Sequence, residues 1–433
     1  MSALRVAAPA GPLDGDLSVP GDKSIGHRAL LCGALADGTT VVRGFSGGAD
    51  VRATLDAIRR LGAPASSEGD TVRVTGAGLE LGAGRETALD CANSGTTMRL
   101  GIGLVAGVAG GCVLDGDGSL RKRPMERVAE PLRAMGARIE TAAGRPPVRV
   151  QGGGLVAVDW TLAVASAQVK SAILLAGLRA RGTTRVREPV ASRDHTERLL
   201  AHMGVTLART DGAIVLAGGQ RLRAAHVPLP GDPSSAAFLV VAALLVPGST
   251  LRVRDVGLNP TRTGALAILR RMGGDIRTER VREEAGEPRG DLIVRASRLH
   301  GTTIDSAEVP AAIDELPVLA VAAALADGET RITGAGELRV KESDRLAALE
   351  QLRALGVAME AMPDGLVIAG VAGRRLRPGR VDAAGDHRIA MAFAVAGLCA
   401  EGGVEIADPE CVAVSFPGFF SDLAGLGAAV EAA

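Results

Sequence analysis

Short amphipathic stretches recur along the chain, and each ends in the same three-residue pattern. The pattern is Leu or Met, then Gly, then a small residue, and its glycine falls at Gly62, Gly136, Gly204, Gly273, Gly356 and Gly427. The gaps between these glycines run from 68 residues (136 to 204) to 83 residues (273 to 356). Glycine is a common C-terminal stop for a helix, so each stretch is predicted to be a helix that ends there. A repeat of this length predicts a substantial α/β unit, because solenoid repeats are shorter.

The segments between the repeat glycines share an internal order. Each begins with a small-residue apolar stretch that predicts a helix, as at Ala29–Ala36, Ile173–Leu178, Phe238–Leu245, Val318–Leu325 and Met391–Leu398. A glycine turn and β-branched residues then predict a strand, as at residues 38–42, 182–186, 248–253 and 328–332. A polar loop and the amphipathic helix complete the unit. Single matches arise by chance in a chain rich in Ala and Gly, but six ordered copies predict an α/β fold of repeated units.

Polar loops precede the first helix of each unit. They lie at residues 21–24, 93–96, 166–168, 231–235, 314–315 and 386–388. Several of their residues are of types that cap helix N-termini, so they could simply satisfy backbone N–H groups. Helix N-termini also attract anions, because free N–H groups and the positive end of the dipole point outward. Both interpretations remain open at this point.

The loops before the second helices differ in charge from copy to copy. Residues 47–50 and 414–417, in the first and last copies, carry no cation. Basic residues are concentrated instead at 121–125, 192–195, 259–262 and 339–345. A purely structural repeat would show less asymmetry, so a purely structural role is disfavoured for these basic loops.

Composition narrows the class of protein. The 433 residues include 49 Lys plus Arg and 49 Asp plus Glu, and this balance disfavours non-specific binding to nucleic acid or to acidic membranes. The apolar run Ala236–Val246 stops well short of the roughly 18 residues that a membrane span needs. The first residues do not resemble a signal peptide. Five cysteines without C-x-x-C spacing favour free thiols. We therefore expect a soluble, cytoplasmic protein that binds neither nucleic acid nor membrane.

Lysine is rare enough to be informative. The chain has 45 arginines and four lysines, Lys23, Lys122, Lys170 and Lys341, all in the polar loops or directly beside them. Lysine is a compact charge that can donate a proton, whereas arginine is a planar group that stays charged. Lys23 and Lys341 are therefore predicted to take part in chemistry. For Lys122 and Lys170, a part in chemistry and the support of a neighbouring residue are about equally plausible.

The sequence signals of three other chemistries are either absent or lack the required context. Residues 101–106 match a dinucleotide-binding glycine pattern, but they lie inside an apolar, helical stretch with no strand before it. No P-loop is present, and the six histidines never show the i, i+4 spacing of a helical metal site. For His195 and His387, structural hydrogen bonds are the favoured role.

Six motif segments together resemble a known family, 5-enolpyruvylshikimate-3-phosphate (EPSP) synthase. They are residues 20–30, 93–100, 123–125, 166–168, 340–346 and 386–388, and the similarity extends from about Val19 to Phe420. The resemblance implies transfer of the carboxyvinyl group of phosphoenolpyruvate to the 5-hydroxyl of shikimate 3-phosphate, with release of phosphate. It implies no metal and no organic cofactor, and it suggests a monomer.

The resemblance also implies two domains of three repeats each, around an interdomain cleft. One domain is expected to span 21–230, and the other 1–20 plus 231–433. The chain is expected to cross between them near residues 20 and 230, where Pro-Gly pairs occur.

The resemblance also implies site residues, wherever a position of this chain matches a position of the family's motifs. Those that match contacts to shikimate 3-phosphate are Lys23, Ser24, Arg28, Ser166, Ala167, Gln168, Arg193, Asp314 and Lys341. Those that match contacts to phosphoenolpyruvate are Lys23, Gly95, Arg123, Gln168, Arg345 and Arg388. Asp314 resembles the proton acceptor and Glu342 a partner carboxylate, while either Lys23 or Glu342 could protonate the methylene carbon.

Two positions depart from the family pattern. Ala167 replaces a serine that many members carry, so backbone is expected to supply one phosphate hydrogen bond. Val414 stands where many members have a lysine in the last repeat, which changes how the phosphate of phosphoenolpyruvate is held.

Charge balance is consistent with these assignments. The two substrates carry roughly −5 to −6 in total. Seven cations are assigned to them, namely Lys23, Arg28, Arg123, Arg193, Lys341, Arg345 and Arg388. Without ligand these cations repel one another, so we expect an open cleft that closes when the anions bind.

Two alternatives remain. UDP-N-acetylglucosamine enolpyruvyl transferases share the fold and the chemistry, but they place a reactive cysteine in the loop of the second repeat. Here Cys112 is predicted to precede the strand, and the loop is residues 117–123, without cysteine. The second alternative is a non-catalytic anion-binding protein. The carboxylates Asp314 and Glu342 count against it, because a pure anion binder has no use for them.

Overall fold

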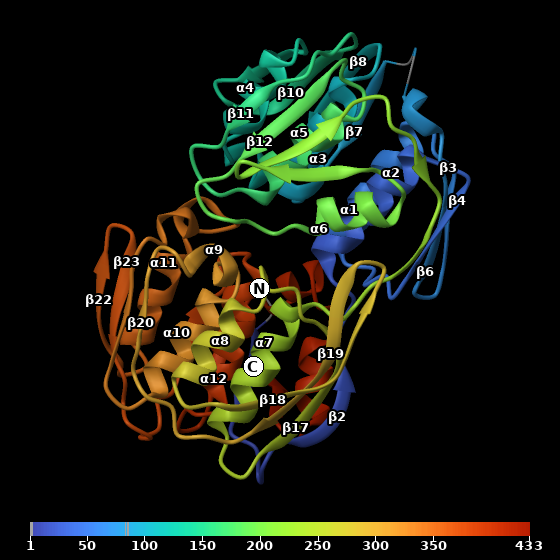
Figure 1. Ribbon diagram of the computed structural model, residues 1–433. Coiled ribbons are helices and arrows are strands. Elements are labelled where there is room, and N and C mark those ends of the chain that lie inside the picture. Colours follow the sequence, from blue (N-terminus) through green and yellow to red (C-terminus); the bar gives the residue numbers. More distant parts are fainter. Residues whose placement is uncertain (1–2, 83, 85) are drawn as a thin grey trace. The chain divides into compact units, whose positions relative to one another are not determined.

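The computed structural model describes residues 3–82, 84 and 86–433. The chain forms two units (Figure 1). Unit 1 comprises Met1–Pro20, Pro230–Arg282 and Pro288–Ala433, and unit 2 comprises Gly21–Leu229 and Glu283–Glu287. The chain therefore passes from one unit to the other between residues 20 and 21 and again between 229 and 230.

Each four-stranded sheet in the described residues contains a parallel pair of strands with an antiparallel partner beside it. In unit 2 the strand orders are β16(His226–Pro228)–β4(Thr39–Arg43)–β6(Thr71–Thr75)–β5(Ala65–Glu68), β7(Thr87–Asp90)–β8(Gly110–Asp115)–β10(Arg145–Gly152)–β9(Arg138–Ala142) and β11(Asp159–Thr161)–β12(Thr183–Arg187)–β14(Ala213–Ala217)–β13(Leu207–Thr210). The parallel pairs are β16/β4, β7/β8 and β11/β12. This common pairing confirms that the sequence repeat is a structural repeat.

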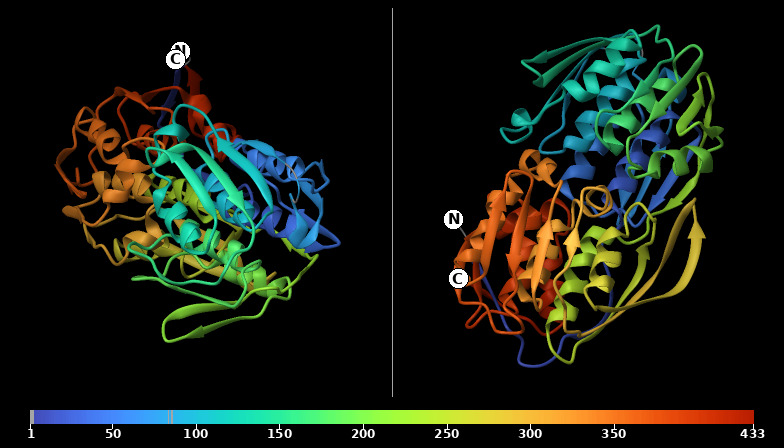
Figure 2. Two further views of the ribbon diagram at one scale, coloured as in Figure 1. Left: turned by 90° about the horizontal axis from the view of Figure 1, so that it is seen from above. Right: turned by 60° about the vertical axis from the view of Figure 1, so that its left-hand side comes forward.

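Unit 1 repeats the same pairing. Its strand orders are β18(Asp275–Glu284)–β19(Glu287–Arg295)–β17(Thr250–Gly257)–β2(Asp14–Ser18), β20(Thr303–Ile304)–β21(Glu329–Ile332)–β23(Gly365–Ala369)–β22(Ala358–Met362) and β24(Gly379–Asp382)–β25(Val404–Ala407)–β1(Ala3–Ala7)–β26(Ala429–Ala432). The parallel pairs are β2/β17, β20/β21 and β24/β25. Because β1 pairs with β26, the two ends of the chain lie side by side (Figure 2). The N-terminal strand thus completes the last copy.

The first helices of the copies form the centre of each unit. They are α1(Lys23–Leu35), α3(Gly95–Ala106) and α5(Ala167–Gly177) in unit 2, and α7(Pro233–Leu245), α10(Leu316–Leu325) and α12(His387–Gly397) in unit 1. Nearly every residue of these helices is buried, as expected for helices that are apolar on all sides. Helices α3 and α5 pack so closely that a Cβ at Gly103 would lie 2.3 Å from the carbonyl oxygen of Ala172. The glycine pattern at 101–106 therefore serves helix packing.

The second helices are amphipathic and end near the repeat glycines. They are α2(Ala49–Arg60), α4(Glu126–Ala134), α6(His195–His202), α8(Gly264–Arg271), α11(Arg345–Leu349) with its 3-10 extension Glu350–Arg353, and α13(Phe419–Gly425). The repeat glycines have φ between +89° at Gly204 and +107° at Gly427. Glycine adopts this left-handed region without steric cost, which confirms the predicted helix stops.

One segment departs from the expected division of the chain. Residues 283–287, at the turn between β18 and β19, group with unit 2, although the flanking strands belong to unit 1. His195 Nδ1 lies 2.7 Å from Glu287 Oε1, and Arg198 donates to the Gly286 carbonyl at 2.9 Å. His195 therefore makes a structural hydrogen bond, as predicted. In the part of the chain that the structure describes, no helix combines the length and apolarity that a membrane crossing requires.

Candidate active site

The polar loops at the starts of the first helices do cap them. Backbone N–H groups of the first turn donate to Asp22, Ser94, Ser166, Asp232 and Asp386, over distances of 2.8 to 3.4 Å. The capping interpretation is therefore correct for these five positions. Glu315, which precedes α10, makes no side-chain cap bond in the described structure.

Lys23 is the first residue of α1, and its Nζ lies 2.9 Å from Asp50 Oδ2. Both side chains are largely buried, with 14% and 9% of their surface exposed. Asp50 lies in the first turn of α2, in the loop at residues 47–50 that carries no cation. It was not among the predicted site residues, and the available signal was an acidic residue in the first turn of a predicted helix.

Arg28, Ser24 and Arg193 lie together in unit 2. Arg28 donates through Nη1 to the Ser24 carbonyl at 2.8 Å and through Nε to Thr196 Oγ1 at 2.7 Å. Arg193 Nη1 lies 3.5 Å from Ser24 Oγ. Burial lowers the pKa of Arg28 to about 10, although the negative charge of Glu197 opposes the change. Arg28 is therefore still a cation at neutral pH.

Gln168 is held in place by two residues of α3. It accepts a hydrogen bond from Arg99 Nη1 at 2.8 Å and donates to Thr96 Oγ1 at 2.9 Å. Arg99 was not among the predicted site residues, although it lies within the motif at 93–100 and is buried. Ser166 and Ala167 lie beside Gln168 at the start of α5.

Gly95 leaves room for two guanidinium groups at the start of α3. A Cβ at this position would lie 2.9 Å from Arg99 Nη1 and 3.2 Å from Arg123 Nη1. Arg123 is buried and donates to Asn93 Oδ1. The second repeat therefore concentrates positive charge at one helix N-terminus, which is a favourable environment for an anion.

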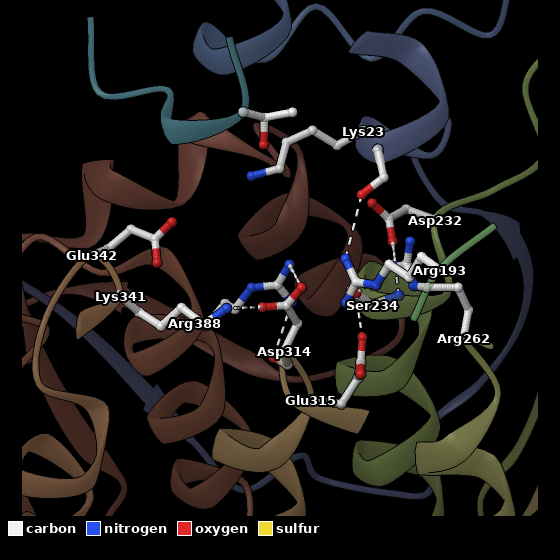
Figure 3. Close-up of polar contacts among 12 residues, drawn as sticks. Lys23, Arg193, Asp232, Ser234, Arg262, Asp314, Glu315, Lys341, Glu342 and Arg388 are labelled. Carbon is white, nitrogen blue, oxygen red and sulfur yellow. Dashed lines mark hydrogen bonds and ion pairs between the residues drawn. The ribbon is translucent and has the colours of Figure 1, made fainter. Parts of the chain in front are cut away.

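In unit 1, cations surround the Asp314 carboxylate (Figure 3). Lys341 Nζ lies 3.8 Å and Arg345 Nη1 3.5 Å from Asp314 Oδ1, while Arg388 Nη2 lies 3.9 Å from Oδ2. Arg388 also donates through Nη1 to the Asp314 carbonyl at 3.1 Å. Asp314 lies in the link between α9(Val309–Ala312) and α10, so tertiary packing brings distant motif segments to it.

Arg345 is fully buried and joins two further carboxylates. It donates to Asp386 Oδ2 at 2.8 Å and to Glu342 Oε2 at 2.7 Å. Burial opposes the charge of Arg345, but Asp386 and Glu342 outweigh burial and raise the pKa of Arg345 above its ordinary value. Burial would raise the pKa of Asp386, but Arg345 holds it below the ordinary value. Arg345 Nη1, on the Asp314 side, has no hydrogen-bond partner among the described residues.

A second buried cluster lies in unit 1 and includes residues that were not predicted as site residues (Figure 3). Arg262 Nη2 lies 3.0 Å from Asp232 Oδ1 and donates to Ser234 Oγ at 2.8 Å. Ser234 donates in turn to Glu315, the neighbour of Asp314 in sequence. The two polar loops of the fourth copy therefore meet each other and adjoin the Asp314 segment.

The remaining candidates are placed as follows. Lys122 is exposed in the 3-10 helix Leu120–Lys122. Lys170 is completely buried and paired with carboxylates. Val414 is half-buried at the end of the 3-10 helix Pro409–Val414.

Cys112 lies inside β8 rather than before the strand, which corrects the prediction. It is buried, and burial raises the pKa of its thiol to about 12. A thiol with this pKa is almost entirely protonated at neutral pH and is a poor nucleophile. Burial and the raised pKa of Cys112, rather than a position before the strand, therefore support the conclusion that the second repeat offers no reactive cysteine.

Comparisons with known proteins agree with the resemblance read from the motifs. Residues 7–423 match the profile of the family described as EPSP synthase (3-phosphoshikimate 1-carboxyvinyltransferase). The 3-phosphoshikimate 1-carboxyvinyltransferase of Halorhodospira halophila is 54% identical over 428 residues, which cover 98% of this chain and 96% of that protein. The protein of the same name from Syntrophotalea carbinolica is 50% identical over 424 residues, covering 97% of this chain and 98% of the relative.

A solved structure agrees with these sequences. The EPSP synthase of Acinetobacter baumannii superimposes with a TM-score of 0.89 at 41% identity, covering 100% of both chains. With this similarity over the whole length, and with the motif residues placed as described, the chain belongs to the EPSP synthase (3-phosphoshikimate 1-carboxyvinyltransferase) family.

Proposed function

We propose that this protein transfers the carboxyvinyl group of phosphoenolpyruvate to the 5-hydroxyl of shikimate 3-phosphate and releases phosphate, a step in aromatic amino-acid biosynthesis. The observation that carries the proposal is the Asp314 carboxylate beside Lys341, Arg345 and Arg388. Such a carboxylate can accept a proton, and cations next to it can hold the anionic groups of the substrates. A protein that only binds anions would gain nothing from a carboxylate at this point.

The substrate contacts are proposals at the level of residues. Shikimate 3-phosphate is assigned to Lys23, Ser24, Arg28, Ser166, Ala167, Gln168, Arg193, Asp314 and Lys341. Phosphoenolpyruvate is assigned to Lys23, Gly95, Arg123, Gln168, Arg345 and Arg388. Two observations support these assignments. Arg99 orients Gln168 through a hydrogen bond, and Gly95 leaves space beside the guanidinium groups of Arg99 and Arg123. Both place ordered polar groups at a helix N-terminus, where an anion can bind.

The reaction proceeds by addition and then elimination. In the addition, the 5-hydroxyl oxygen bonds to the central carbon of phosphoenolpyruvate, Asp314 takes the hydroxyl proton, and Lys23 or Glu342 protonates the methylene carbon. In the elimination, phosphate leaves the central carbon and the new methyl group returns a proton to the group that protonated it, Lys23 or Glu342, which restores the carbon–carbon double bond. Acid–base help of this kind contributes about 10²- to 10⁴-fold. Holding the two substrates together contributes more, since effective molarities reach roughly 10⁵–10⁸ M.

Neither a metal nor an organic cofactor is part of this proposal, since no step above needs one. We further propose that the protein acts as a cytoplasmic monomer. Absence of net charge and the short apolar runs support this location.

Phosphate release by the purified protein tests the proposed function. We expect release from phosphoenolpyruvate with shikimate 3-phosphate and none with UDP-N-acetylglucosamine as the acceptor. Release with the sugar nucleotide alone would mean that the acceptor was assigned wrongly. No release with either acceptor would leave an anion-binding protein on a catalytic scaffold.

A further inference from the structure

Lys170 has no role in the assignments above, yet its environment is highly organised. Its side chain is 0% exposed and lies in α5, one helical turn after Ser166. Its Nζ lies 2.8 Å from Glu188 Oε2 and 2.9 Å from Glu197 Oε1, and it donates to the Ser192 carbonyl at 3.3 Å. The ammonium group donates hydrogen bonds to Glu188 and to the Ser192 carbonyl, and it forms an ion pair with Glu197. A charge this deeply buried is tolerated because it is paired with two carboxylates.

The three partners all belong to the segment that carries Arg193. Glu188 directly follows β12, Ser192 directly precedes Arg193, and Glu197 lies in the first turn of α6. Ser192 also donates through its hydroxyl to Glu188. Lys170 therefore fastens both ends of the 188–197 segment to α5.

A second link runs alongside the first. Ser171 and Thr196 are neighbours of Lys170 and Glu197 in sequence, and their hydroxyl oxygens lie 2.6 Å apart. Both hydroxyls accept from Arg28, at 2.9 Å from Nη2 to Ser171 and 2.7 Å from Nε to Thr196. The position of the Arg28 guanidinium therefore depends on the distance between α5 and α6. Lys170 sets this distance through its ion pair with Glu197.

Each carboxylate of this buried group faces a cation. Glu188 and Glu197 pair with Lys170, and the negative charge of Glu197 also acts on Arg28. Without Lys170, Glu188 would lose its ion pair, and Glu197 would keep, among the described residues, only the exposed Arg209 and the charge of Arg28. Arginine at position 170 would keep the charge, but its planar fork cannot direct donors at three acceptors around one point, and no space is exposed there.

We propose that Lys170 is a positioning residue for shikimate 3-phosphate, which holds the 188–197 segment against α5 so that Arg193, Arg28 and Ser166 are aligned for the substrate phosphate. This proposal rests on the proposed function. It explains why one of only four lysines in a chain with 45 arginines is buried in unit 2.

The test compares binding of shikimate 3-phosphate by the full-length protein and its Lys170→Met and Lys170→Arg variants, measured by isothermal titration calorimetry. We expect both variants to bind at least about tenfold more weakly, because several phosphate contacts lose their alignment together. At saturating shikimate 3-phosphate, the KM for phosphoenolpyruvate and kcat should each change by less than about threefold, since a saturating ligand restores the aligned state.

Arg179→Met is the matched control. Arg179 is a part-buried cation just beyond the other end of α5, and it donates to the carbonyls of Leu79 and Leu104, both at 2.6 Å. Its loss should lower the melting temperature and leave the affinity for shikimate 3-phosphate unchanged. Equal weakening by Arg179→Met would overturn the proposal, because any buried cation would then have the same effect.

If Lys170→Met does not fold, Glu188→Gln tests the same link with a milder change. It keeps the shape of the side chain and removes the charge that pairs with Lys170 and accepts from Ser192. We expect about threefold or greater weakening of shikimate 3-phosphate binding. Wild-type affinity in a folded Lys170→Met or Glu188→Gln variant would overturn the proposal. Failure of the wild-type protein to release phosphate would instead overturn the proposed function.

Discussion

Lys23 Nζ and Asp50 Oδ2 lie 2.9 Å apart at the starts of two adjacent helices. The Asp50 carboxylate is therefore already in place when an anion binds Lys23. The anion either displaces this carboxylate from the lysine or shares the lysine with it. This pairing keeps the ammonium group in one position, so a substrate meets a charge that is already oriented. A compact charge suits this arrangement better than a fork-shaped one.

Lys23→Arg should abolish most of the activity even though the charge is retained. Arginine cannot donate a proton at neutral pH and cannot occupy the same position beside Asp50, so we expect kcat to fall by at least about 100-fold. Steady-state phosphate release measures the effect. Lys122→Arg is the matched control, because Lys122 is exposed on a short 3-10 helix and its substitution should leave kcat unchanged. Normal turnover by Lys23→Arg would contradict the role given to this lysine.

Asp314→Ala should bind shikimate 3-phosphate and lose turnover. The substitution removes the proposed proton acceptor but leaves Lys341, Arg345 and Arg388 to hold anions. We expect kcat to fall by about 10²- to 10⁴-fold, while binding of shikimate 3-phosphate is retained. Calorimetry and phosphate release together separate binding from chemistry. Asp327→Asn, at an exposed ion pair with Arg298, should behave as wild type. Asp314 would not be the base if its alanine variant turned over normally.

Gly95→Ala should weaken binding of phosphoenolpyruvate more than that of shikimate 3-phosphate. A Cβ there would lie 2.9 Å from Arg99 Nη1 and 3.2 Å from Arg123 Nη1, so both guanidinium groups must shift. We expect the KM for phosphoenolpyruvate to rise by about tenfold, while the protein still folds because flexible side-chain ends can move. Gly118→Ala is the control, since a Cβ at 118 would meet nothing within 4 Å. An unchanged KM would contradict the assignment of Gly95 to the phosphoenolpyruvate site.

Stability at low pH should depend on the Asp386–Arg345 pair. Asp386 has a pKa below its ordinary value in the folded protein, because Arg345 outweighs the effect of burial. The ionised Asp386 therefore adds to the free energy of unfolding. This contribution is fully present above the pKa of an aspartate in the unfolded chain, about 3.9, and it is lost as the pH falls toward the lower pKa of Asp386 in the folded protein. Asp386→Asn should therefore lower the free energy of unfolding by about 3–5 kcal/mol at pH 7 and flatten its decline below about pH 4.

Urea unfolding of Asp386→Asn and wild type between pH 7 and pH 3 checks this prediction. The difference between the two curves should shrink as the pH falls, because protonation removes the same ion pair in the wild type. A difference that stays constant would mean that the cost is one of packing alone.

Local features of the chain were predictable from sequence. The repeat glycines adopt positive φ and end their helices, and five of the predicted loop side chains cap theirs. These features depend on neighbours within one or two helical turns, so their signal lies in adjacent residues. The family motifs were also readable, and the comparisons confirm the family that they indicated.

Other features depend on residues far apart in sequence. Asp50 is 27 residues from Lys23, and Arg99 is 69 residues from Gln168. A polar residue seen alone does not reveal which of many opposite charges it will meet, so these pairs were missed. Cys112 was misplaced for a related reason, since the length of β8 is set by pairing with β10 rather than by local composition.

The sequence by itself therefore determined the repeated α/β unit, the ends of its second helices and the loops that cap its first helices, because these follow from short-range periodicity and capping. The first helices begin two to six residues before the predicted apolar stretches, because most of their first turns carry polar residues. The tertiary structure alone decided that Asp314 lies among three cations from other segments, that Lys170 is buried between Glu188 and Glu197, and that residues 283–287 group with unit 2. The physical reason is that charge pairing acts through space, and the positions in space of distant segments are set by how the copies pack.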